Sequence, residues 1–305
     1  MEIYLPIAEV SINALLLLML GAIAGILAGM FGVGGGFLLT PLLIFVGIPP
    51  SVAVASQANQ VIASSVSGFQ IQLRRGNVDL RMGFVLLAGG LIGSTGGVFV
   101  FGFLKRLGQI DFVIAASYVV LLSSIGTLML IESWRTWRRQ RAGVPVRRKL
   151  HQHYLVHRLP LKMRFYTSRL YISAVLPFML GLAIGALSAI LGVGGGFVMV
   201  PAMIYLLGMP TIVTIGTSSF HILVVAANVT VLQAITNQTV DIVLAMLLIL
   251  GSVVGTPVGT RLATRLPGFG LRGALAVTIL GVATELVFEL LAPPHSLYTL
   301  GEILR

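Results

Sequence analysis

The sequence predicts an all-α polytopic membrane protein made of two homologous repeats, each with four or five transmembrane segments. The first observation is composition: 57% of the 305 residues are hydrophobic and only 10% are charged, and the mean hydropathy is +1.01. A soluble domain carries about 25% charged residues, so lipid has to cover much of this surface. The other two observations are a glycine-rich string that occurs twice and one basic segment between the copies.

The repeat is centred on the string GVGGGF, which occupies 32–37 and recurs at 192–197. The flanking stretches 21–41 and 181–201 share 10 of 21 residues, and each ends in a proline. A string of this length, repeated at a fixed offset within similar flanks, indicates a duplication. The two halves are therefore expected to place their unusual backbone at the same point.

Apolar segments mark the expected helices. They run over 12–31, 37–48, 51–73, 80–104 and 109–132, and then over 171–191, 197–208, 211–235, 240–263 and 272–292. A spanning helix needs about 20 residues, so 37–48 and 197–208 are predicted to be short broken or re-entrant helices after the glycine-rich turns. The predicted regions are a first membrane repeat 1–132, a basic cytoplasmic linker 133–170, a second membrane repeat 171–292 and a tail 293–305.

The basic segment sets the expected orientation. Between Ser133 and Leu170 there are 11 Lys and Arg residues and no Asp or Glu, whereas the rest of the chain has nine of each sign. Such a loop stays in the cytoplasm, and its cations are expected to contact anionic lipid headgroups rather than nucleic acid. Five crossings per half make the repeats inverted, and four make them parallel. The loop charges favour five, because Lys105 and Arg106 are then the only loop cations that fall outside the cytoplasm.

Glycines at four-residue spacing and two aspartates are interpreted as structural. The glycine series let helix backbones approach closely in lipid; they are Gly21, Gly25 and Gly29, then Gly89, Gly93 and Gly97, then Gly251, Gly255 and Gly259. Asp79 and Asp241 each lie at the start of an apolar segment, and a carboxylate at that position caps a helix. These residues are therefore expected in packing and capping roles.

The tandem glycines are candidates for an anion site. Glycine permits backbone shapes closed to other residues, so successive N–H groups converge on one point and the following helix adds the positive end of its dipole. The alternative is a tight turn between packed helices. The candidate residues are Gly34, Gly35, Gly36, Gly194, Gly195 and Gly196.

Polar residues after each short segment are further candidates, because their hydroxyl and amide groups can coordinate the oxygens of an anion without adding net charge. They are Ser56, Gln57 and Asn59 in the first half and Thr217 and Ser218 in the second. The alternative role is hydrogen bonding between helices. His221 is the one histidine within an apolar segment and is a proton-coupling candidate, with a structural role as the alternative. No cysteine, nucleotide-binding motif or catalytic constellation is present, so no metal, no cofactor and no enzyme activity is expected.

These residues resemble a known family. The paired Gly-x-Gly-Gly-Gly-x4-Pro elements at 32–41 and 192–201 are similar to those of the sulfite exporter TauE/SafE family, also called the toluene-sulfonate uptake permease group. Gly216-Thr217-Ser218 resembles the family's Gly-Thr-Ser element, whereas the first half has Ser56-Gln57-Ala58. The resemblance implies about eight helices and transport of a small sulfur-containing anion such as sulfite or an organosulfonate.

The expected function is therefore secondary transport of a small anion across the cell inner membrane, bound near the repeat interface and coupled to a proton gradient. A homo-oligomer is compatible with this interpretation. The alternative is a membrane channel with a similar polar lining but no alternating access, and the two differ in whether solute accumulates above equilibrium.

Overall fold

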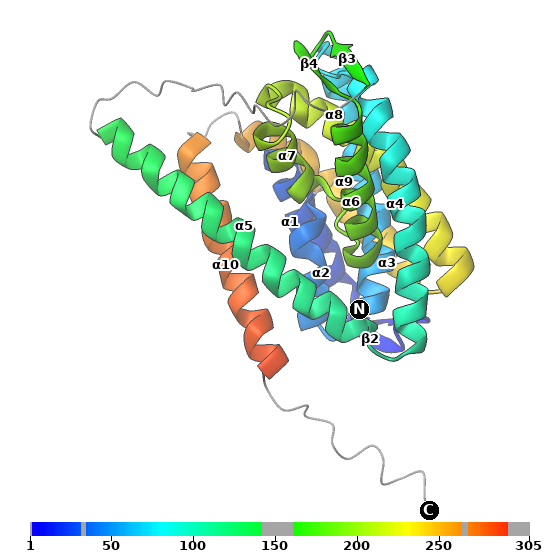
Figure 1. Cartoon of the computed structure of the whole chain (residues 1–305). Helices are drawn as coiled ribbons and strands as arrows, with labels where there is room; N and C mark the ends of the chain where they lie inside the picture. Colours follow the sequence, from blue (N-terminus) through cyan, green and yellow to red (C-terminus); the bar gives the residue numbers. More distant parts are fainter. Residues whose placement is uncertain (1, 32–34, 142–160, 264–267, 292–305) are drawn as a thin grey trace, which may run out of the picture.

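The computed structural model describes residues 2–31, 35–141, 161–263 and 268–291, and these form a helical bundle (Figure 1). Gly34, the central part of the predicted linker and the predicted tail lie outside the described residues. The helical segments expected from the apolar pattern are present, and the chain is mostly helical as predicted.

The first half contains a hairpin and five helices. Its elements are β1 (Glu2–Leu5), β2 (Val10–Asn13), α1 (Ala14–Phe31), α2 (Gly36–Phe45), α3 (Pro50–Arg74), α4 (Leu80–Arg106) and α5 (Ile110–Arg141). The second half has the same order: β3 (Lys162–Phe165), β4 (Leu170–Ser173), α6 (Val175–Leu191), α7 (Gly196–Tyr205), α8 (Thr211–Leu232), α9 (Ile242–Ala263) and α10 (Gly268–Leu291). A π-helical turn, η2 (Gln233–Asn237), separates α8 from α9.

Each half packs its first helix against the fourth helix of the other half. Helices α1 and α9 run in the same direction, since Gly251 faces Leu18 and Gly259 faces Ile26. Helices α4 and α6 are likewise parallel, with Gly89 against Phe178. A Cβ at these glycines would collide with backbone of the partner helix, so the predicted packing role is confirmed for the glycine series except Gly29, whose packing role stays a prediction.

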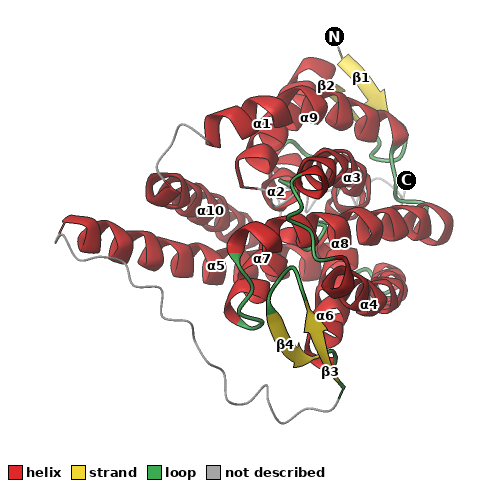
Figure 2. Ribbon diagram, turned by 90° about the horizontal axis from the view of Figure 1, so that it is seen from above, coloured by secondary structure: helices red, strands yellow, loops and turns green. Residues whose placement is uncertain are grey.

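Helix α3 pairs antiparallel with α8, and α5 pairs antiparallel with α10, since Gly216 lies against Gln72 and Gly273 lies against Ser133. Gly68 of α3 faces Ser219 of α8, and Gly126 of α5 faces Leu280 of α10. Seen from above, α2, α3, α7 and α8 lie between the α1–α9 pair and the α4–α6 pair, while α5 and α10 project to one side (Figure 2). The short helices, together with α3 and α8, are thus central in the molecule.

The two ends of the bundle have matching construction. At the β1–β2 end, one apolar cluster joins the hairpin to the start of α1 and α9 and to the end of α2, through Leu5, Leu244 and Leu43. At the β3–β4 end, a second cluster joins the other hairpin to α4 and the end of α7, through Phe165, Met82 and Met203. Equivalent elements therefore begin at opposite ends of the bundle (Figure 1).

The hairpins are a correction to the all-α prediction. Each consists of two four-residue strands joined by four residues, and the two have the same register. The buried apolar residues of each hairpin belong to the apolar clusters at the two ends of the bundle. In the sequence, the apolar pattern of the first hairpin is therefore continuous with that of the adjoining helix, and residues 162–170 fall within the predicted linker. Helix α5 also continues to Arg141, nine residues beyond the predicted segment end at 132.

Asp79 and Asp241 each connect a helix start to a hairpin turn. The Asp79 carboxylate accepts hydrogen bonds from Met82 N at 3.1 Å and from Ser168 N at 2.9 Å. The Asp241 carboxylate accepts from Leu244 N at 3.1 Å and, from the other hairpin, Ile7 N at 3.0 Å. The capping prediction is confirmed for both residues.

Four helices in the described chain are long and apolar enough to cross a bilayer. They lie within Leu80–Arg106, Ile110–Arg135, Ile212–Asn237 and Ile242–Gly259. The described parts of α1, α6 and α10 form shorter apolar helices, and α2 and α7 have ten residues each. The arrangement is that of a polytopic membrane protein in which short helices are enclosed by longer ones.

Candidate functional site

The two short helices begin side by side at the centre of the bundle. Phe37 of α2 and Phe197 of α7 stack with ring centroids 4.4 Å apart and planes 9° apart, and both side chains are buried. Each helix starts directly after a left-handed glycine, Gly35 with φ 67° and Gly195 with φ 74°. Two helix N-termini, each with the partial positive charge of a helix start, therefore meet in an environment without solvent.

Glycine is required in these turns because a Cβ would clash with neighbouring side chains, and also because the backbone is left-handed. A Cβ on Gly36 would lie 2.6 Å from Gln57 Nε2 and 2.7 Å from Val61 Cγ2. A Cβ on Gly194 would collide with Val61 and approach Ile222 Cγ2 to 2.9 Å. The described glycine turns are thus pressed against α3 and α8, and any side chain there would displace the central residues.

Side chains of the first half hold the glycine turn of the second half by its carbonyl groups. Gln57 Nε2 donates to Gly192 O at 2.7 Å, and Tyr118 of α5 donates to Leu191 O at 2.6 Å. Thr40 of α2 donates to Gln57 Oε1 and lies within interaction range of Tyr118. We call Thr40, Gln57 and Tyr118 the carbonyl clamp, because its hydrogen bonds end on the carbonyl groups of Leu191 and Gly192 shortly before α7 begins.

The predicted residues Ser56 and Thr217 make equivalent contacts between halves. Ser56 Oγ accepts a hydrogen bond from Asp241 N at 2.9 Å, and Thr217 Oγ1 accepts one from Asp79 N at 3.0 Å. Both side chains are fully buried. Their observed bonds therefore attach α3 to α9 and α8 to α4, and contact with a solute stays a prediction for both.

The other predicted polar residues bond within their own helices. Asn59 Nδ2 donates to Ser56 O at 3.3 Å, and Ser218 Oγ donates to Ile215 O at 3.0 Å. Such bonds to carbonyls that the helix already uses are easily exchanged for another acceptor. The structure thus brings Gly36 and Gln57 together with the turn containing Gly194 and Gly195, and it does not bring Asn59 into the carbonyl clamp.

His221 is buried where α8 crosses α4. Its ring lies beside Gly90, where a Cβ would collide with Nε2, and near the backbone of Leu86. Neither ring nitrogen has a hydrogen bond of normal geometry among the described residues. At the corresponding crossing of α3 and α9, Gln60 Nε2 donates to Ser252 Oγ at 2.8 Å. A buried polar ring without a partner is costly, which makes His221 unusual in this core.

Sequence reasoning missed Thr40 and Tyr118. Both lie in predominantly apolar segments, and neither belongs to the polar clusters that follow the short segments. The available signal was Thr40 within an otherwise apolar ten-residue helix. Tyr118 had no comparable signal, because its partner Leu191 is 73 positions away along the chain.

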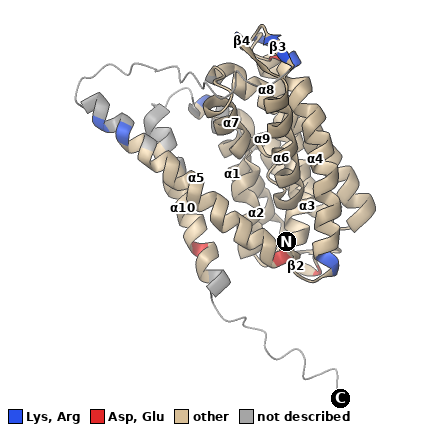
Figure 3. Cartoon of the chain, in the orientation of Figure 1, with Lys and Arg blue, Asp and Glu red and all other residues tan. Residues whose placement is uncertain are grey.

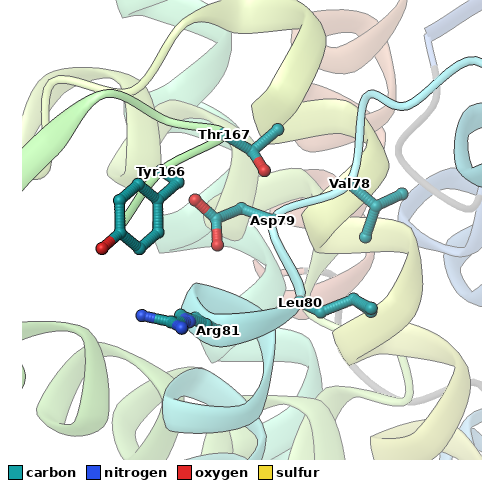
Figure 4. A pocket seen from close by; sticks show the side chains of 6 residues that line it. All are labelled: Val78, Asp79, Leu80, Arg81, Tyr166 and Thr167. Atoms are coloured by element: carbon teal, nitrogen blue, oxygen red, sulfur yellow. The ribbon is translucent and has the colours of Figure 1, made fainter. Parts of the chain in front are cut away.

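A small cavity of about 190 Å³ lies away from this centre, at the β3–β4 end. It is lined by Val78, Asp79, Leu80, Arg81, Tyr166 and Thr167 (Figure 4). It is smaller than the roughly 300 Å³ at which pockets for small molecules begin. Within the described chain, no group of three or more His, Cys, Asp or Glu side chains is placed to hold a metal ion.

Comparison with known proteins gives one family. The sequence matches the family described as sulfite exporter TauE/SafE over residues 17–286. A probable membrane transporter protein of Xylella fastidiosa (strain 9a5c) is 32% identical over 239 residues, 76% of this chain and 78% of its own. The probable membrane transporter protein YjnA of Bacillus subtilis (strain 168) is 26% identical over 240 residues, 78% of this chain and 85% of its own.

A plant protein matches over a shorter stretch. Sulfite exporter TauE/SafE family protein 1 of Arabidopsis thaliana is 44% identical over 62 residues, which is 20% of this chain and 14% of its own length. No solved structure matches the chain.

Proposed function

The chain belongs to the sulfite exporter TauE/SafE family of membrane transporters, and from this premise we propose that it is a secondary transporter for a small anion, sulfite or an organosulfonate. The observation that carries the proposal is the meeting of the α2 and α7 N-termini at the centre of the bundle. Two positive helix ends in a buried environment repel each other, and an anion between them would offset that repulsion.

The proposed binding site consists of main-chain amides. It includes the glycine turns with Gly34, Gly35, Gly36, Gly194, Gly195 and Gly196, together with Gln57 as the nearest polar side chain. Among the buried residues that the structure describes there is no lysine or arginine, so the positive potential at the centre has to come from the helix ends. Ser56, Asn59, Thr217 and Ser218 would join the solute contacts once the helices around them shift.

We further propose that the two halves are inverted repeats that move against each other around this site. The cross-paired helices, the hairpins at opposite ends and the matched contacts of Ser56 and Thr217 support this arrangement. Exposed basic residues at the β3–β4 end support a cytoplasmic position for that end and for the linker, in a cell inner membrane. These residues are Arg74, Arg75, Arg81, Lys162, Arg164 and Arg169.

His221 is the proposed coupling site. Protonation would give the buried ring a charge and a second donor, so the α8–α4 crossing would respond to the proton. We expect His221→Gln to keep downhill transport and to lose the stimulation of uptake by an imposed pH gradient. Initial rates with and without the gradient measure this, and full stimulation in the variant would remove His221 from the proposal. Thr230→Val, at another buried group without a partner in the described chain, is the matched control.

Uptake into proteoliposomes tests the function. Labelled sulfite, sulfoacetate, sulfate and a neutral solute of similar size are supplied with and without a pH gradient. We expect saturable uptake of sulfite or sulfoacetate and accumulation above electrochemical equilibrium when the gradient is present. Equilibration without accumulation would indicate a channel instead, and equal uptake of the neutral solute would contradict the anion site.

A further inference from the structure

The two hairpins occupy equivalent positions but have opposite charge. They share one register, with Glu2 opposite Asn13 in the first and Lys162 opposite Ser173 in the second. At the 160-residue offset of the glycine strings, Glu2 corresponds to Lys162 and Glu9 corresponds to Arg169. The fold alone does not require the change of charge sign between the two hairpins, because all four side chains are exposed.

The basic hairpin forms a cationic and aromatic surface together with the start of α4. Lys162, Arg164 and Arg169 are exposed on it, and Figure 3 shows the blue of Lys and Arg positions along β3 and β4. The Arg81 guanidinium lies 4.9 Å from the centre of the Tyr166 ring. The Arg164 guanidinium lies 5.9 Å from the centre of the Tyr171 ring. Rings and guanidinium groups side by side are typical of the membrane interface.

The cavity described above lies within this surface. Figure 4 shows the Asp79 side chain between Arg81 on one side and Tyr166 and Thr167 on the other. Asp79 is only 2% exposed, and Ser168 Oγ donates to its carboxylate at 2.7 Å in addition to the two backbone amides. The carboxylate is thus occupied by the cap, and Arg81 with the hydroxyl groups of Tyr166 and Thr167 is what the cavity offers to a ligand.

We propose that the β3–β4 hairpin and Arg81 bind the phosphate headgroup of an anionic phospholipid. A lipid suits this surface better than a free anion because exposed apolar side chains lie beside the cations: Leu161 is 71% exposed and Met163 is 39% exposed. The surface is where α4 and α6 begin, and the headgroup layer of a bilayer has to lie at the helix ends. The β1–β2 hairpin, with Glu2 and Glu9, repels the same headgroups.

The test measures lipid retention by the full chain. The protein is purified in detergent with phosphatidylglycerol and phosphatidylcholine at equal concentration, and native mass spectrometry counts the bound lipids. We expect wild type to retain phosphatidylglycerol preferentially. Lys162→Gln, Arg164→Gln and Arg169→Gln together should lower this preference about tenfold or more, since each cation near an anionic surface contributes about a fivefold effect. Arg81→Gln alone should lower it about fivefold.

The matched control is the opposite hairpin. Glu2→Gln with Glu9→Gln removes two charges at the equivalent positions and should leave the preference unchanged or raise it. Inorganic phosphate at the same concentration should not compete; competition as strong as that of the lipid would mean a free-anion site. An unchanged phosphatidylglycerol preference in the triple variant, with its thermal midpoint in phosphatidylcholine equal to that of wild type, would overturn the proposal. This readout does not depend on transport.

Discussion

Three side chains decide the geometry of the described glycine turn. The carbonyl clamp of Thr40, Gln57 and Tyr118 reaches the second turn from the first half, and its hydrogen bonds end on Leu191 and Gly192. In the second half, the counterpart of Gln57 is Ser218, which follows Thr217 and donates to a carbonyl of its own helix. Helix α10, the counterpart of α5, contains no tyrosine. The clamp is therefore asymmetric, although the glycine strings that surround it are identical.

Gly36→Ala tests the contact between the first helix start and Gln57. The new methyl group would displace Gln57 from Gly192 O, so we expect the KM for the transported anion to rise about tenfold, which corresponds to about 1.4 kcal/mol of binding free energy. Kinetics in proteoliposomes separates KM from the maximal rate. Gly96→Ala in α4, where a Cβ would meet nothing within 4 Å, is the control. An unchanged KM for Gly36→Ala would exclude this contact from the site.

Tyr118→Phe tests the other arm of the carbonyl clamp. The variant keeps the ring and leaves the buried Leu191 carbonyl without its donor, so we expect the free energy of unfolding to fall by about 1–3 kcal/mol. The thermal midpoint in detergent measures the change. Tyr4→Phe removes a hydroxyl from a side chain that is 59% exposed and should change stability by less than about 0.5 kcal/mol. Equal midpoints for wild type and Tyr118→Phe would refute the clamp.

The sequence identified part of the site residues and their environment. Gly36 and Gln57 were candidates and lie together, because tandem glycines and a buried amide are visible as local patterns. Ser56 and Thr217 were also visible, yet their partners are the amides of Asp241 and Asp79 in the opposite half. Pairing between halves has no local signal, so a sequence cannot distinguish a solute contact from such a bond.

At the scale of elements, the glycine ridges determine how closely paired helices approach. Their spacing predicted close packing, and the α1–α9 and α4–α6 pairs confirm it. The partners could not be predicted, since every ridge offers the same surface. The hairpins escaped prediction for a different reason: strands of four residues are too short for an alternating pattern to stand out beside an apolar helix.

Gly255→Ala tests the α1–α9 contact. Its Cβ would collide with the Ala22 carbonyl oxygen, which belongs to backbone and cannot rotate away. We expect a loss of about 1–3 kcal/mol of stability, measured as a lower thermal midpoint. Gly281→Ala in α10 has open space around the new methyl group and should be neutral or stabilising by up to about 1 kcal/mol. The same small effect for both variants would contradict the packing.

At the scale of the molecule, the loop charges and the fold agree with the orientation that we propose. Lys105 Nζ donates to Asn237 O at 2.9 Å, so the loops after α4 and after η2 lie at the same end of the bundle. That end also has the acidic β1–β2 hairpin, whereas the exposed arginines at the end of α3 and on the second hairpin are at the other end. The sequence favoured inverted over parallel repeats from loop charges alone, and inverted repeats stay a prediction.

Single thiols test this orientation, and the chain provides a background without cysteine. Glu9→Cys and Lys105→Cys should react with a membrane-impermeant maleimide from the periplasmic side. Arg75→Cys and Arg164→Cys should react only after the membrane is opened. All four positions are exposed, so reactivity reports the side of the membrane. Labelling of residues 75 and 105 from one side would contradict inverted repeats.

Cross-pairing between the halves has a consequence for biosynthesis. Helix α1 leaves the ribosome long before α9, so its glycine surface contacts lipid until most of the polypeptide has been translated. A fragment that stops after α5 would lack the partners of both α1 and α4 and should be degraded rather than accumulate. Synthesised together from separate messages, the two fragments should protect each other from proteolysis.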